Sequence, residues 1–384
     1  MHELFYLAMQ TTRWLASIYC GISWSVSGCG ASDAGTGNEA AGAQSIAVVQ
    51  VETVTTVQSA AGSFLSPIPE QVVPAYVESS TEAESAESAE QQERAKVDVA
   101  LLFRGSHAGS INQELDAQLV PASAAPWSAI SHCFPHAEQT DAGVSWPLAV
   151  SSVALADLAS AISPEWRGWQ DFRGLGVRSA GQPTDLRVPA ATLDFETRGL
   201  SSPLVLSVDG DSLLVTNRSS YAIPRALLIY SHSGGVGVTA LEALAPGEQR
   251  VTVLGPKEHP PDVLLELARE QLTDFFSASV GPELAAAMAS AKSIPFLETQ
   301  GLRLIALLDE QQETAALSFS SPVSAQQRVI VSHSEILKPE EEARVLSVLT
   351  DPSVDAEQAL ETLGRFTQAK LEFAVQSADS DAST

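Results

Sequence analysis

The chain has 384 residues, 45% of them hydrophobic, which is enough for about two to three domains with sizeable cores. Its 47 acidic and 21 basic residues give a formal net charge of −26 at pH 7. Such an acidic surface repels phosphate backbones, and the sequence holds no basic patch to offset it, so the composition argues against nucleic-acid binding.

The N-terminal segment has the layout of a secretory signal. Arg13 precedes a short apolar stretch that ends at Val26, and small residues follow it, as a signal peptidase requires. The stretch is far shorter than the roughly 20 apolar residues that span a bilayer. Glu3 and the lack of basic residues before Arg13 fit a signal poorly, so we keep both Met1 and Met9 as candidate start sites.

The apolar stretch closes on Val26-Ser27-Gly28-Cys29, which resembles the lipobox of bacterial lipoproteins. In that pattern the cysteine thiol takes a diacylglycerol and becomes the mature N-terminus. The resemblance implies that residues 1–28 are a signal peptide, that Cys29 is the lipid attachment site, and that the protein is held on a membrane of the bacterial cell envelope. Gly30 rather than Asp follows, which implies the outer membrane in a Gram-negative cell. The alternative is an ordinary signal peptide or an uncleaved anchor.

The cysteine count agrees with this interpretation. The chain has Cys20, Cys29 and Cys133. Cleavage of the signal would remove Cys20 and lipid would consume Cys29, so the mature chain would have no intramolecular disulfide. We therefore expect ordinary core packing to stabilise the protein.

Residues 29–95 have the composition of a tether. The stretch from Glu78 to Glu93 repeats Ala, Ser and Glu, and such a sequence buries too little apolar surface to offset the entropy of ordering. Its acidic run could bind calcium or a basic partner, but we favour a solvated spacer. Residues 46–51 and 54–57 are strand-like. They could form a docked strand or an apolar patch in a disordered arm, and we favour the disordered arm.

Residues 96–257 are predicted to be rich in β-strands. A strand is expected at 97–103, and a short helix at 153–159. Between 201 and 256 about five short strands follow at regular spacing, and Asp209-Gly210-Asp211 predicts a hairpin turn, because these residue types tolerate positive φ. This pattern favours an antiparallel sandwich of immunoglobulin-like type.

Residues 258–375 change to a mixed pattern. Helices are expected from Asp262, where an apolar stripe recurs every three to four residues, from Pro282 through Met288, from Pro339, and from Asp355. Strands are expected at 302–308 and 327–331, and residues 376–384 form a polar tail. The predicted fold class is therefore α+β: a β-rich N-terminal part with the sandwich, then a smaller α+β part.

Several short segments between about residues 195 and 370 resemble a set of predicted exported bacterial proteins of unknown function. The matching segments are Phe195-Glu196-Thr197-Arg198, Gly301-Leu302-Arg303-Leu304, His333-Ser334-Glu335-Ile336-Leu337-Lys338-Pro339-Glu340 and Gly364-Arg365-Phe366. Residues 310–326 depart from the pattern. The resemblance implies a whole-protein architecture and supplies no activity.

Two motifs suggest chemistry that we do not favour. Gly210-Asp211-Ser212-Leu213 matches the signature of GDSL-type hydrolases, but no Asp of the chain is followed by His at the third position, and the tetrapeptide lies in a predicted hairpin. His132-Cys133-Phe134-Pro135-His136 gathers three potential zinc ligands, but Pro135 opposes a helix and no second cluster exists. We predict no metal site, no cofactor and no catalytic residue.

Four tryptophans are the candidate ligand-binding residues: Trp127, Trp146, Trp166 and Trp169. Together they could form a platform on which sugars stack, but aromatic side chains of this size more often fill cores.

We predict a membrane-anchored envelope lipoprotein that acts as a binding or scaffolding module, with an envelope protein or peptidoglycan as its partner. The alternative is an envelope hydrolase whose active site the sequence does not reveal. An enzyme needs a cleft where His, Asp or Ser converge, whereas a binding module needs an exposed apolar or aromatic patch.

Overall fold

The computed structural model describes residues 46–65, 94–105, 112–121, 127–129, 138–140, 143–151, 168–169, 172, 174–181, 190–198, 202–254, 261–312, 317–320 and 325–350, with isolated positions between 366 and 375. All belong to the unit Gln44–Thr384. The unit Met1–Ala43, which contains the predicted signal and Cys29, lies outside the described residues. So do the acidic stretch at 78–93, the predicted helix at 153–159 and the predicted helix start at Asp355.

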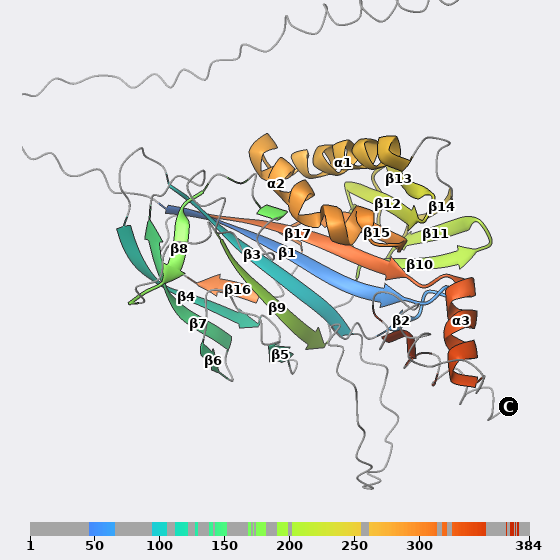
Figure 1. Ribbon diagram of the computed structural model, residues 1–384, viewed down its shortest axis with the longest axis horizontal. Helices are drawn as coiled ribbons and strands as arrows, with labels where there is room; N and C mark the ends of the chain where they lie inside the picture. The colour runs from blue at the N-terminus through green and yellow to red at the C-terminus, as the bar shows by residue number, and fades with distance from the viewer. Residues whose placement is uncertain are drawn as a thin grey trace, which may run out of the picture. The chain divides into compact units, whose positions relative to one another are not determined.

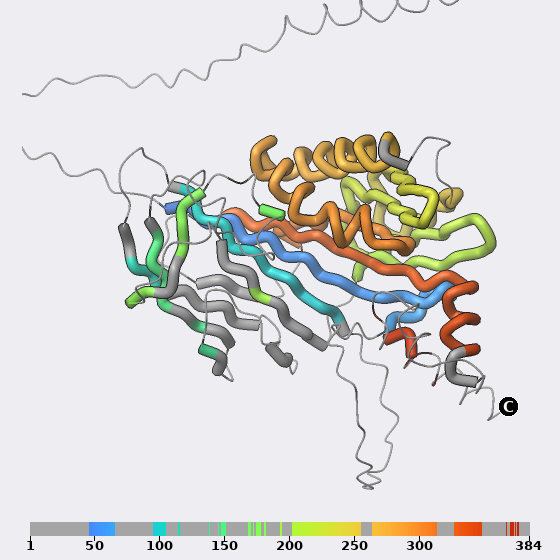
Figure 2. The backbone as a smooth tube through the Cα atoms, in the orientation of Figure 1, coloured from blue at the N-terminus to red at the C-terminus, as the bar shows by residue number. Residues whose placement is uncertain are grey.

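A nine-stranded mixed sheet lies at the centre of this unit, and the helices and two smaller sheets pack against its faces (Figure 1). Its strands follow in the order β13 (Gly235–Leu241), β12 (Arg225–His232), β15 (Gly301–Leu308), β17 (Ala325–Ile336), β1 (Ile46–Gln58), β3 (Arg94–Gly105), β9 (Ala190–Arg198) and β5 (Trp127–Ala129), and β2 (Phe64–Leu65) pairs with the end of β1. β1 and β17 run parallel, and the other neighbouring pairs are antiparallel. Figure 2 shows this meeting of distant segments, with blue β1 beside red-orange β17.

The position of β1 corrects our preference for a disordered arm at residues 46–51 and 54–57. The strand lies between β17 and β3, and nearly all its side chains are buried. Val49 and Val51 face the core on one side of the sheet, and Val48 faces the core on the other. A strand covered on both faces has no polar face to alternate with, which is why its sequence lacks the simple alternating pattern.

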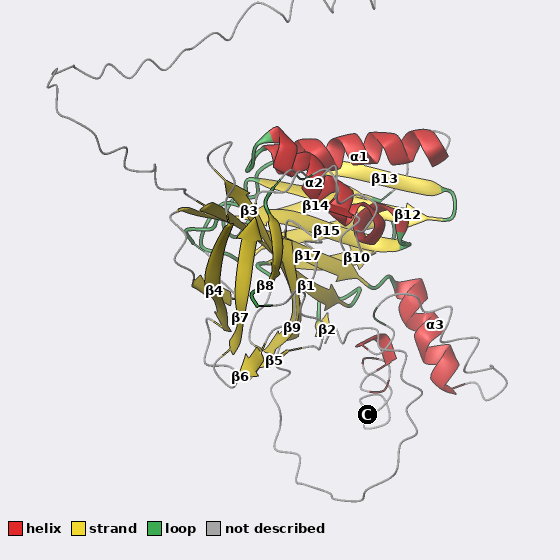
Figure 3. Cartoon of the chain, turned by 60° about the vertical axis from the view of Figure 1, so that its left-hand side comes forward, coloured by secondary structure: helices red, strands yellow, loops and turns green. Residues whose placement is uncertain are grey.

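Two smaller antiparallel sheets pack against one face of the large sheet (Figure 3). One contains β10 (Leu204–Asp209), β11 (Ser212–Asn217) and β14 (Gln249–Val253), and covers β12 and β15. The other contains β16 (Leu317–Ser320), β4 (Asn112–Pro121), β7 (Gly143–Ser151), β6 (Glu138–Thr140) and β8 (Gly176–Ser179), and covers β1 and β3.

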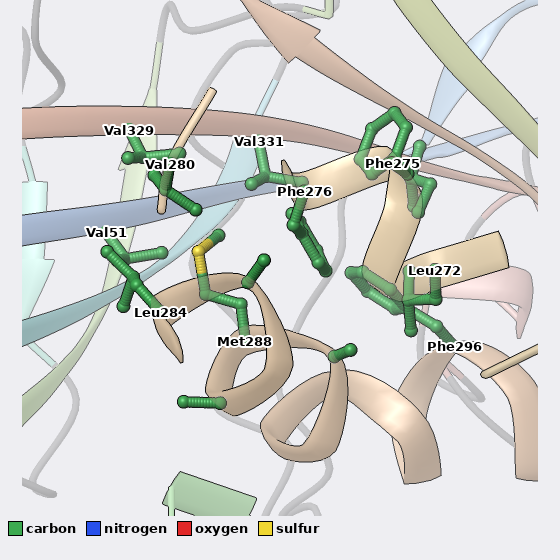
Figure 4. Packing of buried hydrophobic residues seen from close by; sticks show 14 of the residues in the cluster. Val51, Leu272, Phe275, Phe276, Val280, Leu284, Met288, Phe296, Val329 and Val331 are labelled. Atoms are coloured by element: carbon green, nitrogen blue, oxygen red, sulfur yellow. The ribbon is translucent and has the colours of Figure 1, made fainter. Parts of the chain in front are cut away.

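Helices α1 (Pro261–Ser277) and α2 (Pro282–Ser293) cover the opposite face, and a π-helical turn, η3 (Ile294–Glu298), continues α2. Their apolar stripes meet the side chains of β1, β12, β15 and β17 that point away from the smaller sheets. Figure 4 shows Leu272, Phe275 and Phe276 of α1 packed with Met288 of α2 in this core. Helix α3 (Pro339–Thr350) follows β17 directly.

The α+β class is confirmed, as are the helices that start at Pro282 and Pro339, the helix expected from Asp262, and the strands at 302–308 and 327–331. The hairpin at Gly210 is confirmed too, with φ of 57°. The predicted boundary near residue 257 does not separate two sheets, because β15 and β17 lie between β12 and β1. The five strands predicted between 201 and 256 are divided between the nine-stranded and the three-stranded sheet.

Candidate binding surface

The three-stranded sheet has two edges, and the chain itself closes the one formed by β10. The N–H of Val208 donates to the carbonyl of Ala60 (2.8 Å) in the turn after β1. The Gln58 side chain completes this closure: its Nε2 donates to the carbonyl of Leu204 (2.9 Å), and its Oε1 accepts from the N–H of Leu206 (2.9 Å). Little hydrogen-bonding capacity therefore remains at this edge for another strand.

The opposite edge is β14, and its outward backbone groups meet no strand of the described residues. The N–H of Leu254 donates to the carbonyl of Asp211 (2.7 Å), and the carbonyl of Glu248 accepts from the N–H of Asn217 (3.0 Å). Because hydrogen-bonding directions alternate along a strand, these bonds turn the N–H and C=O groups of the intervening odd-numbered residues away from β11. Those residues, which we call the β14 edge, are Gln249, Val251 and Val253.

The side chains of the β14 edge are also exposed. Val251 is 65% exposed and Val253 is 71% exposed. In the register with β11, Val251 lies opposite the half-buried Leu214, so these apolar side chains share the outer face of the sheet. Val251 and Val253 thus present an exposed apolar surface beside the outward backbone groups of β14.

Asn217 holds the turns that position β14. Its side chain is fully buried, and its Nδ2 donates to the carbonyls of Tyr221 and Leu244 (both 2.9 Å). Its Oδ1 accepts from the backbone N–H (2.9 Å) and from the hydroxyl (2.7 Å) of Ser219. One amide side chain thus ties the end of β11 to the segment that leads into β14.

Replacing Asn217 with alanine should lower the free energy of unfolding by about 1–3 kcal/mol, because buried carbonyls lose their donors. Urea denaturation of the full chain, followed by circular dichroism, measures this loss. The neighbouring Ser220→Ala is the control, since Ser220 is exposed and its loss should cost less than about 0.5 kcal/mol. Equal midpoints for the two variants would contradict the role given to Asn217.

Carboxylates lie near both ends of the β14 edge, and the one at the Glu248 end is paired with Arg250 (2.5 Å). Near the Val253 end, Asp211 is exposed one strand in from the edge and Asp209 two strands in, both on the hairpin between β10 and β11. Glu248 lies at the other end, where a hydrogen bond from the N–H of Ala245 (2.8 Å), and after it the Arg250 guanidinium, lower the pKa of its carboxyl. Glu248 therefore stays anionic at neutral pH.

A second group of polar side chains converges beneath η3. Arg303 of β15 is fully buried and donates from Nε (3.1 Å) and Nη2 (3.0 Å) to the two carboxylate oxygens of Glu335 on β17. Its Nη1 donates to the carbonyls of Pro295 (2.9 Å) and Phe296 (2.6 Å). The carbonyl of Pro295 is available because the N–H of Thr299 donates to Ile294 (3.0 Å) in the π-type pattern instead of to Pro295. We call this group the Arg303–Glu335 clamp.

Beyond the clamp, Glu335, His333 and Thr55 contact one another in the acid–histidine–hydroxyl order of a catalytic triad. His333 Nε2 lies 3.0 Å from Glu335 Oε2, and His333 Nδ1 lies 3.2 Å from the hydroxyl oxygen of Thr55. A nucleophilic hydroxyl must reach its substrate. Thr55 is only 3% exposed, His333 is 1% exposed, and Arg303 occupies both oxygens of the carboxylate. The arrangement accounts for how η3, β15, β17 and β1 are held together.

The structure corrects the role considered for Trp169. Its side chain is 6% exposed and belongs to the core beneath α2, so it offers no stacking surface. The backbones of Trp127 and Trp146 lie in different sheets, in β5 and β7. The side chains of these two residues, and all of Trp166, lie outside the described part of the chain.

The other residues singled out from the sequence have simple placements. Ser212 opens β11 directly after the hairpin turn, in an antiparallel pair, as predicted. His132, Cys133 and His136 lie outside the described residues. Where the structure is described, no group of three or more His, Cys, Asp or Glu side chains could hold a metal ion.

The sequence contained a signal for the clamp that we did not use. Arg303 is a lone charge within the apolar run from Leu302 to Leu308, and a buried charge almost always has a partner. The β14 edge had no comparable signal, because strand order decides which strand of a sheet is left at its edge.

Comparisons with known proteins identify no family. No family model matches the sequence, and no curated protein matches it. Among solved structures, the yeast delta-COP-I mu-homology domain complexed with the Dsl1 WxWxV peptide is similar over 76% of this chain and 96% of that chain, with 6% identity and a TM-score of 0.29. The same yeast domain without the peptide is similar over 76% of this chain and 95% of that chain, with 6% identity and a TM-score of 0.28. Likenesses this weak establish neither a shared fold nor a shared function.

A search for membrane-spanning helices also gave a negative result within the described ranges. None of the helices there combines the length and the apolar character that crossing a bilayer requires.

Proposed function

We propose that the protein is a lipid-anchored binding module of the bacterial cell envelope, attached through Cys29 and binding a protein partner through the β14 edge. The observation that carries the proposal is the β14 edge itself. It combines outward backbone groups with two strongly exposed valines on a sheet that packs against β12 and β15. Stable attachment to a membrane needs more than one acyl chain, which lipoprotein processing at Cys29 would supply.

We also propose that the sandwich formed by β10 to β14 is immunoglobulin-like. Support comes from its two antiparallel layers, which pack face to face through Leu206 and Val215 on one side and Ala226 and Leu228 on the other. A protein partner suits this surface better than peptidoglycan, because the edge offers alternating aliphatic side chains and Trp169 is buried.

The binding role is tested by placing a photo-crosslinking residue at Val253 of the full chain, in a bacterium that exports it. We expect one crosslinked product of defined mass in the envelope fraction. The matched control carries the crosslinker at Glu270, which is exposed on α1. Equal labelling at both positions, or none at Val253, would count against a partner at this edge.

The anchor is tested separately by feeding labelled palmitate to cells that make the wild type or Cys29→Ala. We expect label and membrane retention in the wild type and the loss of both in the variant. Label that persists without the Cys29 thiol would sink the lipid-anchor proposal.

A further inference from the structure

We propose that the β14 edge binds an extended, basic peptide segment as an added β-strand, with apolar side chains at alternate positions. This inference rests on the proposed function and names the chemistry of its partner. An edge strand with outward N–H and C=O groups is a template for another strand, because main-chain hydrogen bonds then continue the sheet. On β14 those groups belong to Gln249, Val251 and Val253.

The β10 and β14 edges of the three-stranded sheet differ in how they are protected, and this difference favours the β14 edge as the binding edge. Natural sheet edges are usually protected by charged side chains, proline, bulges or a covering segment. The β10 edge is covered by Ala60 and Gln58. The outward residues of the β14 edge, Gln249, Val251 and Val253, carry no charge. The guanidinium of Arg250, between them, donates to the carbonyl of Glu242 (2.9 Å).

The outer face of β14 selects apolar side chains in the added strand. Side chains directly opposite each other on neighbouring strands lie close together on the same face of a sheet. An added strand would therefore place every second side chain beside Val251 or Val253. Covering these two valines, which are 65% and 71% exposed, removes apolar surface from water.

The acidic charge of this protein favours a basic segment, rather than a second copy of the chain, as the added strand. Asp211 is exposed opposite Leu254, one strand in from the Val253 end of the edge, and Asp209 is exposed one strand further in. Long Lys or Arg side chains at the end of an added strand would extend toward this pair of carboxylates. Two copies would each bring a net charge of −26, and their mutual repulsion opposes edge-to-edge pairing.

The test uses the full chain and a labelled peptide of alternating Val and Thr with Lys at each end, read by fluorescence anisotropy. The matched peptide carries Glu in place of Lys. We expect saturable binding of the Lys peptide that weakens with salt, and binding of the Glu peptide at least about tenfold weaker. A third peptide, N-methylated at alternate backbone nitrogens, should lose binding, because it cannot donate to the edge.

Two variants of the protein complete the experiment. In Val251→Pro the lost N–H is one that faces the open edge, so the ladder with β11 is kept, and we expect affinity for the Lys peptide to fall at least about tenfold. In Val251→Thr the N–H and the branched shape are kept, so the affinity should stay within about threefold of the wild type. The comparison of the Lys, Glu and N-methylated peptides uses the wild-type chain, so it tests the inference even if Val251→Pro unfolds.

Three results would overturn the inference. They are equal binding of the Lys and Glu peptides, unchanged binding of the N-methylated peptide, and a dimer in sedimentation that Val251→Pro abolishes, which would assign the edge to a second copy. The inference and the proposed function fail separately. A specific crosslink at Val253 without peptide binding would support a partner at this edge and contradict the added basic strand. Peptide binding without a crosslink in cells would support the added strand and contradict a partner in the envelope.

Discussion

Replacing Glu335 with glutamine should lower the free energy of unfolding by about 3–5 kcal/mol, because the guanidinium of Arg303 would stay buried without its counter-charge. Arg303 is fully buried and the Glu335 side chain is 8% exposed, so water cannot replace the lost carboxylate. We expect the change to appear in the urea midpoint of the full chain and to loosen η3, whose carbonyls of Pro295 and Phe296 depend on Arg303.

The matched control for the clamp is an ion pair on the surface. Arg225 and Asp274 are 3.3 Å apart, with side chains 45% and 78% exposed, so Arg225→Gln should cost no more than about 1 kcal/mol. The double variant Arg303→Met with Glu335→Leu replaces both charges with apolar groups and should recover much of the stability lost in Glu335→Gln. If Glu335→Gln unfolds like the wild type, the clamp is not the structural element described here.

Replacing Phe276 with alanine is the second large effect, with an expected loss of about 3–5 kcal/mol in the free energy of unfolding. The ring is fully buried between α1 and the sheet and meets Phe275 edge-on, with centroids 5.2 Å apart (Figure 4). Its removal leaves a cavity that the rigid sheet cannot close, and the helices should detach first in hydrogen-exchange measurements.

The control for Phe276 is Val253→Ala, which removes an apolar side chain that is 71% exposed. It should change the free energy of unfolding by less than about 0.5 kcal/mol. A similar cost for both substitutions would mean that α1 does not contribute to the main core.

The helical part could be predicted because its signals are local. The stripe of Leu264, Ala268, Leu272 and Phe275 recurs at helical spacing, and all four side chains are buried against the sheet. Pro282 begins α2, and three glutamates open α3, where the helix dipole favours carboxylates. The hairpin at Gly210 was predictable for the same reason, since the turn depends on the residues within it.

The central place of β1 could not be predicted with the same means, although its segment is strand-like. Gln50, Glu52, Thr55 and Gln58 are polar residues of β1 that stand among its apolar positions. In the structure all four are buried. Glu52 pairs with Arg328 (3.2 Å), and Gln58 bonds to the backbone of β10. Thr55 contacts His333. These partners are 146 to 278 residues away in the sequence, so no local pattern reveals them.

The sequence by itself determined the α+β class, the positions of most helices and strands after residue 201, and the resemblance of Val26-Ser27-Gly28-Cys29 to a lipoprotein signal. These depend on short-range periodicity, turn chemistry and a contiguous motif. The tertiary structure alone decided that β1 lies at the centre of the large sheet, that Arg303 and Glu335 meet in the core, and that β14 is left at an edge. Strand order and the pairing of buried charges depend on contacts between distant residues, which local sequence patterns do not encode.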